Sequence, residues 1–76
     1  MDVITATVDA RGQSCPGPLV SLHRALKDAL RGDLLELLAT DPGSRSDVPS
    51  WSRLSGNDLV ETSEDAGVYR YVIRKA

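Results

Sequence analysis

A near-continuous apolar run over Asp33–Thr40 constrains the fold of this chain more than any other feature. It holds four leucines, Gly32 stands before it, and Asp41-Pro42-Gly43 follows it. Leucine alone also permits a helix, but stop signals on both sides of so short a run favour a strand. Strands of this composition are usually covered on both faces. The run therefore predicts a strand that is buried on much of both its faces.

Two helices are expected, one before this strand and one after it. Apolar residues at helical spacing predict the first over Pro18–Leu30, because proline suits a helix start and Gly32 can close the helix end. The second is expected to begin near Ser46 or Asp47, both good N-caps, with Pro49 in its first turn. The side chains expected to face the core from these helices are Leu19, Leu22, Leu26, Ala29, Leu30, Val48, Trp51 and Leu54.

Three further strands complete the order β-α-β-α-β-β. They are expected at the start of the chain up to Val8, over Leu59–Ser63 and over Val68–Arg74, with a hairpin turn at Asp65-Ala66-Gly67. A right-handed β-α-β start followed by a closing hairpin gives an α+β fold. We expect a two-layer α/β sandwich with a four-stranded mixed sheet, both helices on one face, and a single domain over residues 1–76.

The composition excludes several classes of protein. The 76 residues include one cysteine and one histidine, whereas a structural zinc site takes about four such ligands. The net charge of −2 argues against a nucleic-acid binder, which normally carries a basic surface. We recognise no signal peptide and no membrane-length apolar run. We therefore expect a cytoplasmic monomer with no cofactor, no metal, no membrane attachment and no direct contact with nucleic acid.

The only cysteine, Cys15, stands between a loop and the first expected helix. Pro16 favours an extended backbone at Cys15, so we expect the cysteine to lie outside the helix. Gly17 is the expected N-cap and has no side chain to crowd the sulfur, and Pro18 fixes the helix start. A lone cysteine is often a buried apolar residue, but Pro-Gly-Pro at a helix start keeps the chain near the surface. This pattern favours a functional thiol.

The helix start also predicts how this thiol would behave. The free N–H groups of Leu19 and Val20 and the positive end of the helix dipole are expected to face Cys15. Such a field lowers the pKa of a thiol and keeps the reactive thiolate populated. Pro18 occupies the place of the second cysteine of a Cys-x-x-Cys motif, so no internal disulfide can form. A single thiolate can instead accept a sulfur atom from a donor persulfide and present it to an acceptor.

Basic residues follow Cys15 along the helix. Arg24, Lys27 and Arg31 fall at helical spacing and, with Arg11 in the loop, would form a basic surface for partner docking. The simpler interpretation of such a run is a solvated helix face. His23 lies more than a turn beyond the helix start with no acidic residue to orient it, so we interpret it as a surface or helix-packing residue.

The stretch Val8–Leu19, with its Cys-Pro-x-Pro motif, resembles the signature of the TusA/SirA-like sulfur carriers. The likeness continues in order through Ala39–Gly43, Ser46–Pro49 and Tyr69–Lys75, so it covers essentially the whole chain. The x of the motif is Gly17, where several members of the family carry a larger or charged residue.

The resemblance implies the same β-α-β-α-β-β sandwich and a persulfide on Cys15, with Gly12 shaping the loop and Pro16 and Pro18 framing the thiol. It implies relay of sulfur from a cysteine desulfurase or a rhodanese-like donor to an acceptor protein. The acceptor would be a DsrE-like protein or thiolation enzyme of transfer-RNA thiolation, or a protein of sulfur oxidation or cofactor synthesis. Such a carrier transfers sulfur stoichiometrically, so whether it counts as an enzyme stays open.

Two alternatives remain. One is a non-catalytic binding or regulatory module of the same fold that uses the basic helix face. The other is a thiol redox sensor that forms a sulfenic acid, although the chain offers no resolving cysteine.

Overall fold

The computed structural model describes residues 3–14 and 16–76, so Cys15 lies outside the described residues. The expected order β-α-β-α-β-β is confirmed. The elements are β1 (Ile4–Ala10), α1 (Gly17–Lys27), β2 (Leu34–Ala39), α2 (Ser44–Ser55), β3 (Asp58–Asp65) and β4 (Val68–Arg74).

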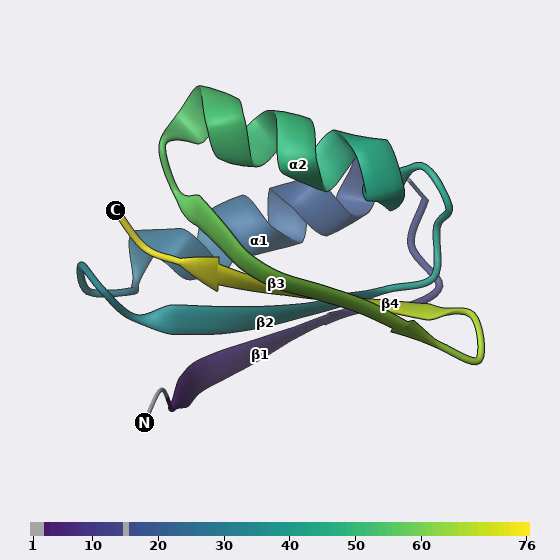
Figure 1. Cartoon of the computed structure of the whole chain (residues 1–76), viewed down its shortest axis with the longest axis horizontal. Helices are drawn as coiled ribbons and strands as arrows, with labels where there is room; N and C mark the ends of the chain where they lie inside the picture. The colour runs from purple at the N-terminus through teal and green to yellow at the C-terminus, as the bar shows by residue number, and fades with distance from the viewer. Residues whose placement is uncertain (1–2, 15) are drawn as a thin grey trace.

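The four strands form one mixed sheet in the order β1-β2-β4-β3. Strand β1 runs parallel to β2, while β4 is antiparallel to both β2 and β3. Both helices lie over the same face of the sheet, as expected, and the other face has no helix (Figure 1). Helix α1 packs over β1 and β2, and α2 packs over β3 and β4.

The core lies between the helices and the sheet, and β2 crosses its middle. Leu35 and Leu37 are almost fully buried on the helix side of β2, and Leu34, on the opposite face, is also buried. Burial on both faces is what the leucine-rich run predicts. The other large core side chains are Leu22, Leu26, Val48, Tyr71 and Ile73.

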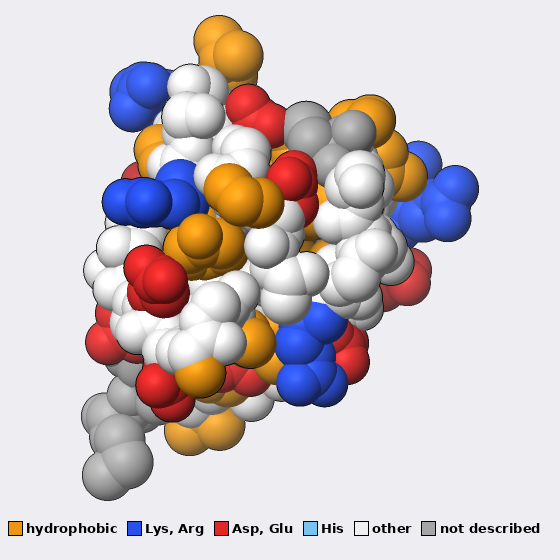
Figure 2. All heavy atoms as spheres, turned by 90° about the vertical axis from the view of Figure 1, so that its right-hand side faces the viewer, with side chains coloured by type: hydrophobic (Ala, Val, Ile, Leu, Met, Phe, Trp, Pro, Cys, Tyr) orange, Lys and Arg blue, Asp and Glu red, His pale blue; other side chains and the backbone are white. Residues whose placement is uncertain are grey.

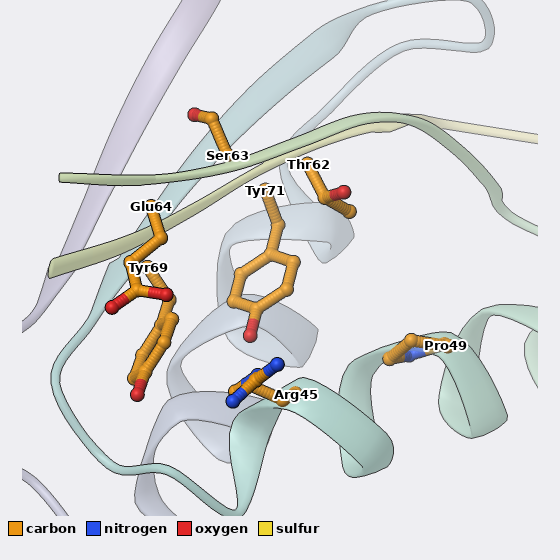
Figure 3. Close-up of a pocket in the computed structure, with 7 residues that line it drawn as sticks. All are labelled: Arg45, Pro49, Thr62, Ser63, Glu64, Tyr69 and Tyr71. Carbon is orange, nitrogen blue, oxygen red and sulfur yellow. The ribbon is translucent and has the colours of Figure 1, made fainter. Parts of the chain in front are cut away.

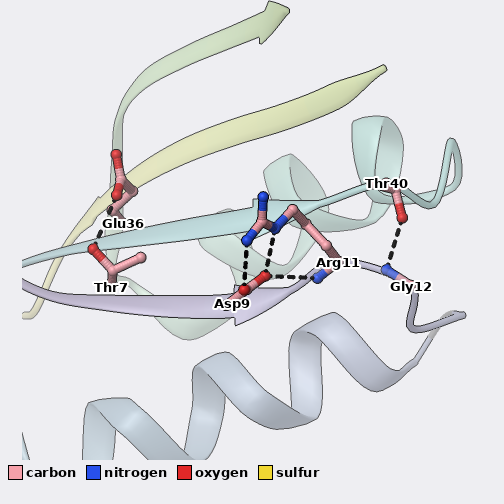
Figure 4. A network of polar contacts seen from close by, with 6 residues as sticks. All are labelled: Thr7, Asp9, Arg11, Gly12, Glu36 and Thr40. Atoms are coloured by element: carbon pink, nitrogen blue, oxygen red, sulfur yellow. Dashed lines mark hydrogen bonds and ion pairs between the residues drawn. The ribbon is translucent and has the colours of Figure 1, made fainter. Parts of the chain in front are cut away.

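Polar side chains tie the four strands together on the face without helices. Thr7 on β1 donates a hydrogen bond of 2.9 Å to Glu36 on β2 (Figure 4). Arg70 on β4 pairs with Glu36 on one side and with Glu61 on β3 on the other. The hydrogen bonds from Arg70 and then from Thr7 lower the pKa of the Glu36 carboxyl below its ordinary value of 4.5.

This lowered pKa makes stability depend on acid pH. A carboxyl with a lower pKa in the folded state stabilises the fold above its unfolded pKa. That contribution is lost as the pH falls from 4.5 through the folded pKa. We expect Glu36→Gln to be less stable than the unaltered protein near neutral pH but to lose less stability in acid. Urea unfolding midpoints measured over this pH range give the difference. If the midpoints of the two proteins fell equally with pH, Glu36 would not be the source of the acid dependence.

Helix α1 ends at Lys27, so the expectation that it continues to Leu30 is wrong. The turn that follows is closed by its own hydrogen bonds: the Leu30 N–H donates to the Asp33 carboxylate at 2.9 Å, and the Gly32 N–H donates to the carbonyl oxygen of Lys75 at 2.8 Å. These bonds turn the chain out of the helix. Leu30 is consequently 74% exposed and does not face the core.

Helix α2 begins at Ser44, two or three residues before the expected start at Ser46 or Asp47. The buried Ser44 hydroxyl lies 2.8 Å from the Tyr71 hydroxyl, which ties the helix start to β4. The earlier start places Pro49 inside the helix rather than in its first turn. Ser44, Val48 and Ser52 form the inner face at four-residue spacing. Leu54 lies off this face and is 89% exposed, so its expected core position is also wrong.

The β3–β4 hairpin has a two-residue turn at Ala66 and Gly67, one residue shorter than expected. Both residues have positive φ, 50° and 82°. Positive φ at both central positions is the geometry of a type I′ turn, whose twist matches that of the flanking strands.

Candidate functional site

The loop between β1 and α1 carries the chemistry that the sequence predicts. It lies at the right-hand end of the molecule in Figure 1, together with the β2–α2 loop and the β3–β4 hairpin. Because Cys15 is outside the described residues, the site is defined by the loop residues before it and by the helix start after it.

The first part of the loop is tied to the β2–α2 loop. The Gly12 N–H donates a hydrogen bond of 2.9 Å to the Thr40 hydroxyl (Figure 4). Gly12 has a φ of +82°, a region that residues with a side chain rarely adopt, so glycine suits this turn. The Gln13 N–H donates to the carbonyl oxygen of Ala10 at 3.2 Å and closes the turn. These contacts hold the loop against the end of the sheet.

We expect Thr40→Val to loosen this loop without unfolding the protein, because Thr40 is exposed and the change removes one hydroxyl. A lost hydrogen bond of about 1 kcal/mol corresponds to roughly fivefold faster exchange of the Gly12 amide proton. Amide hydrogen exchange measures this directly. Thr40→Ser keeps the hydroxyl and should exchange at the original rate. Equal exchange rates in the valine and serine variants would show that the hydrogen bond does not hold the loop.

Helix α1 begins at Gly17, and Pro16 is its N-cap, so the expectation that Gly17 caps the helix is wrong. The reason is local hydrogen bonding: the Pro16 carbonyl oxygen accepts the first bond of the helix, and the Gly17 N–H donates to the Ser14 carbonyl oxygen at 2.7 Å in the turn before it. The Val20 N–H donates to the Pro16 carbonyl oxygen at 3.0 Å and is therefore not free, contrary to expectation. Pro18 lies in the first turn, where its missing N–H costs no helix bond.

The absence of a side chain at Gly17 makes room for Gln13. A Cβ atom at position 17 would lie only 3.0 Å from the Gln13 Oε1 atom and 3.1 Å from its Cβ atom. The same Oε1 atom accepts a hydrogen bond of 3.2 Å from the Ser21 hydroxyl. Gln13 thus bridges the loop and the second turn of α1. Sequence reasoning missed this contact, since nothing in the local pattern pairs these two residues.

Arg11 does not lie free in the loop. Its guanidinium pairs with the Asp9 carboxylate at 2.8 Å (Figure 4). The hydrogen bonds from Arg11 lower the pKa of the Asp9 carboxyl to about 2. The two exposed side chains therefore form a neutral pair at physiological pH.

The predicted basic residues of the first helix lie away from the loop. Arg24 and Lys27 are exposed in the last turn of α1, and Arg31 is exposed beyond the helix end. At about 1.5 Å per residue, Arg24 is roughly 12 Å along the axis from the N-cap. On the end of the molecule that Figure 2 shows, Lys and Arg side chains lie apart from one another, with Asp and Glu between them. No basic patch gathers there.

His23 is exposed and lines a shallow groove with Lys27 and Trp51, on the side of α1 that faces α2. It lies about 10 Å along the axis from the helix start. This placement agrees with a surface role. Neither helix of the described chain is long and apolar enough to cross a membrane.

The fold and the loop define a class of small α/β sandwich whose only cysteine immediately precedes the N-cap of its first helix. The family model described as "Sulfurtransferase TusA" matches residues 6–75, and the chain belongs to this TusA family.

Relatives in several bacteria support the assignment. The "Sulfur carrier protein TusA" of Pseudomonas aeruginosa is 44% identical over 72 residues, which are 95% of this chain and 91% of that protein. The protein of the same name from Pseudomonas putida is 41% identical over 70 residues, 92% of this chain and 88% of that protein. The crystal structure of a SirA-like protein from Desulfitobacterium hafniense has a TM-score of 0.79 at 28% identity. The match covers 91% of this chain and 95% of that one.

Proposed function

We propose that this protein is a sulfur carrier that holds sulfane sulfur as a persulfide on Cys15 and passes it between proteins. The observation that carries the proposal is the position of the only cysteine, directly before the N-cap of α1 in a member of the TusA family. The relatives named above carry the name of sulfur carriers.

The proposed chemistry needs no oxidant or reductant beyond the partners. The Cys15 thiolate attacks the outer sulfur of a donor persulfide. The sulfur–sulfur bond of the donor breaks, its cysteine leaves as a thiolate, and a new sulfur–sulfur bond joins the transferred atom to Cys15. Delivery repeats the same exchange, with the thiolate of the acceptor as the attacking group and Cys15 as the leaving thiolate.

The start of α1 supports this chemistry electrostatically. The partial positive charge of a helix N-terminus favours an anionic sulfur nearby. The first turn, residues 17–20, holds no acidic residue that would cancel this charge. The chain has no second cysteine, so the transferred sulfur cannot be lost to an internal disulfide.

The proposed partners are proteins on both sides of the relay. The donor is a cysteine desulfurase or a rhodanese-like protein, and the acceptor is a DsrE-like protein or another thiolation enzyme. We further propose that the protein works as a monomer in the cytoplasm, in transfer-RNA thiolation, sulfur oxidation or cofactor synthesis. Arg24, Lys27 and Arg31 would guide docking from the side of α1, while Arg11 contributes less because Asp9 neutralises it.

A relay experiment tests the proposal. The protein is incubated with a cysteine desulfurase and cysteine carrying radioactive sulfur, is separated from the donor, and is then mixed with a DsrE-like acceptor. We expect the label to travel with this protein and to appear on the acceptor afterwards. Label that never leaves the desulfurase, or that stays on this protein in the presence of several competent acceptors, would count against a carrier role.

A further inference from the structure

Strand β3 is an open edge of the sheet with a strongly acidic sequence. It lies outermost in the order β1-β2-β4-β3, so one of its sides pairs with no other described strand. Every second residue of an edge strand directs its N–H and C=O groups outward, where they can pair with another chain. Among its eight residues are four acids and no base: Asp58, Glu61, Glu64 and Asp65.

The two faces of β3 offer different surroundings. Residues paired across strands share a face, so Thr62 and Glu64, opposite Tyr71 and Tyr69, lie on the helix side. Three acids form a row on the other side: Asp58 lies before the register shift between Leu59 and Glu61, and Glu61 and Asp65 lie after it. Glu61 is partly neutralised by Arg70, while Asp58 and Asp65 have no ion-pair partner among residues 3–14 and 16–76. An incoming strand would therefore meet these three acids on one of its faces and a single acid, Glu64, on the other.

A groove of about 350 Å³ lies on the helix side, between β3 and α2. Figure 3 shows the rings of Tyr69 and Tyr71 reaching from β4 towards α2, with Pro49 and Arg45 on the helix. The Arg45 guanidinium lies 5.9 Å from the centre of the Tyr69 ring. The groove is lined by one cation, Arg45, and one anion, Glu64, so it has no net preference for a charged occupant, and its aromatic and proline surfaces suit uncharged side chains. A strand that pairs with β3 would therefore need basic side chains on the side of the acidic row and uncharged side chains on the side of the groove.

We propose that β3 is a docking edge for an extended segment of a partner protein that pairs with it as a fifth strand. The segment carries basic side chains at every second position, facing the acidic row, and uncharged apolar side chains between them, over the groove. Main-chain pairing at such an edge supplies affinity, and the alternating side chains supply specificity.

The charges on β3 decide between the possible occupants. A second copy of this chain would bring two acidic rows together, and like charges on adjacent strands are destabilising. The other edge strand, β1, has Asp9 as its only charged residue, and Arg11 already neutralises it. The charges therefore favour a basic partner segment over a second copy as the occupant, and they favour β3 over β1 as the edge that binds it. The docking edge does not depend on the chemistry of Cys15.

Amide NMR with a defined peptide tests this inference. The probe is a synthetic peptide of alternating lysine and valine, capped at both ends and matched to the eight residues of β3. We expect saturable shifts along β3 and around the groove, and slower exchange of the outward amide protons. Two further peptides have the same side chains and differ in their backbone. One is N-methylated at every lysine, and the other is N-methylated at every valine. One of them should fail to bind, because N-methylation removes the main-chain donors that pair with β3.

Two protein variants with the same chemical change show whether peptide binding depends on the charge of the acidic row or only on the net charge of the protein. Asp65→Asn removes a charge from the acidic row, and Asp28→Asn removes one from the exposed end of α1. We expect the first to weaken peptide binding about two- to fivefold and the second to leave it unchanged. Absence of saturable β3 shifts, equal binding of both N-methylated peptides, or equal weakening by the two variants would each overturn the inference. None of these outcomes bears on the persulfide.

Discussion

Replacing Cys15 with serine is expected to abolish sulfur uptake completely. A serine hydroxyl cannot form the sulfur–sulfur bond of a persulfide, and the chain has no other cysteine to take over. In the relay experiment, the serine variant should leave the labelled sulfur on the desulfurase and deliver none to the acceptor. The change is close to isosteric, so folding should be unaffected, and circular dichroism can verify this.

The matched comparison is charge reversal on α1, with Arg24→Glu and Lys27→Glu. If the protein is a carrier, these variants should slow transfer by weakening encounter with the partner, yet still load sulfur. A binding or regulatory module predicts the reverse pattern in cells, with Cys15→Ser fully functional and charge reversal inactive. The two patterns cannot be confused.

Leu37→Ala is expected to destabilise the protein by about 2–5 kcal/mol. Leu37 lies on β2, is fully buried, and packs in the core between the sheet and the helices. Small domains bury little apolar surface, and total stabilities are about 5–15 kcal/mol, so this loss would unfold a large share of the molecules under mild conditions. Urea denaturation followed by circular dichroism measures the change.

Leu54→Ala removes the same atoms from the outer side of α2, where Leu54 is 89% exposed. We expect a change within about 0.5 kcal/mol, since surface substitutions away from special contacts are usually this small. Comparable losses in the two variants would mean that the position of the core has been assigned incorrectly.

The sequence predicts the architecture well because its signals are local and strong. Glycine and proline residues stand on both sides of the leucine-rich run that becomes β2. The order of the elements follows from breaks of this kind between them. The misplaced boundaries have distant causes. The early start of α2 depends on the bond between Ser44 and Tyr71, which are 27 residues apart, and the early end of α1 on a turn held partly by Lys75. Local patterns cannot reveal such contacts.

The candidate site, too, has parts that the sequence predicts and parts that depend on distant contacts. Cys15 and its prolines are evident from sequence because residue type and spacing imply the chemistry. The loop contacts from Gly12 to Thr40 and from Gln13 to Ser21 join segments that only the fold brings together. The Asp9–Arg11 pair was open to prediction, since an aspartate at the start of a turn often accepts a hydrogen bond from the residue two positions on, as Asp9 does here from the Arg11 N–H. That spacing would have removed Arg11 from the expected basic surface.

Intact-protein mass spectrometry of the unaltered chain tests the central claim most directly. The protein is incubated with a competent desulfurase and cysteine, or with a rhodanese and thiosulfate, and is weighed before and after treatment with a reductant. We predict a gain of one sulfur atom that fragmentation assigns to Cys15 and that the reductant removes. An unchanged mass with both donors, or a sulfur atom located on any other residue, would contradict the account.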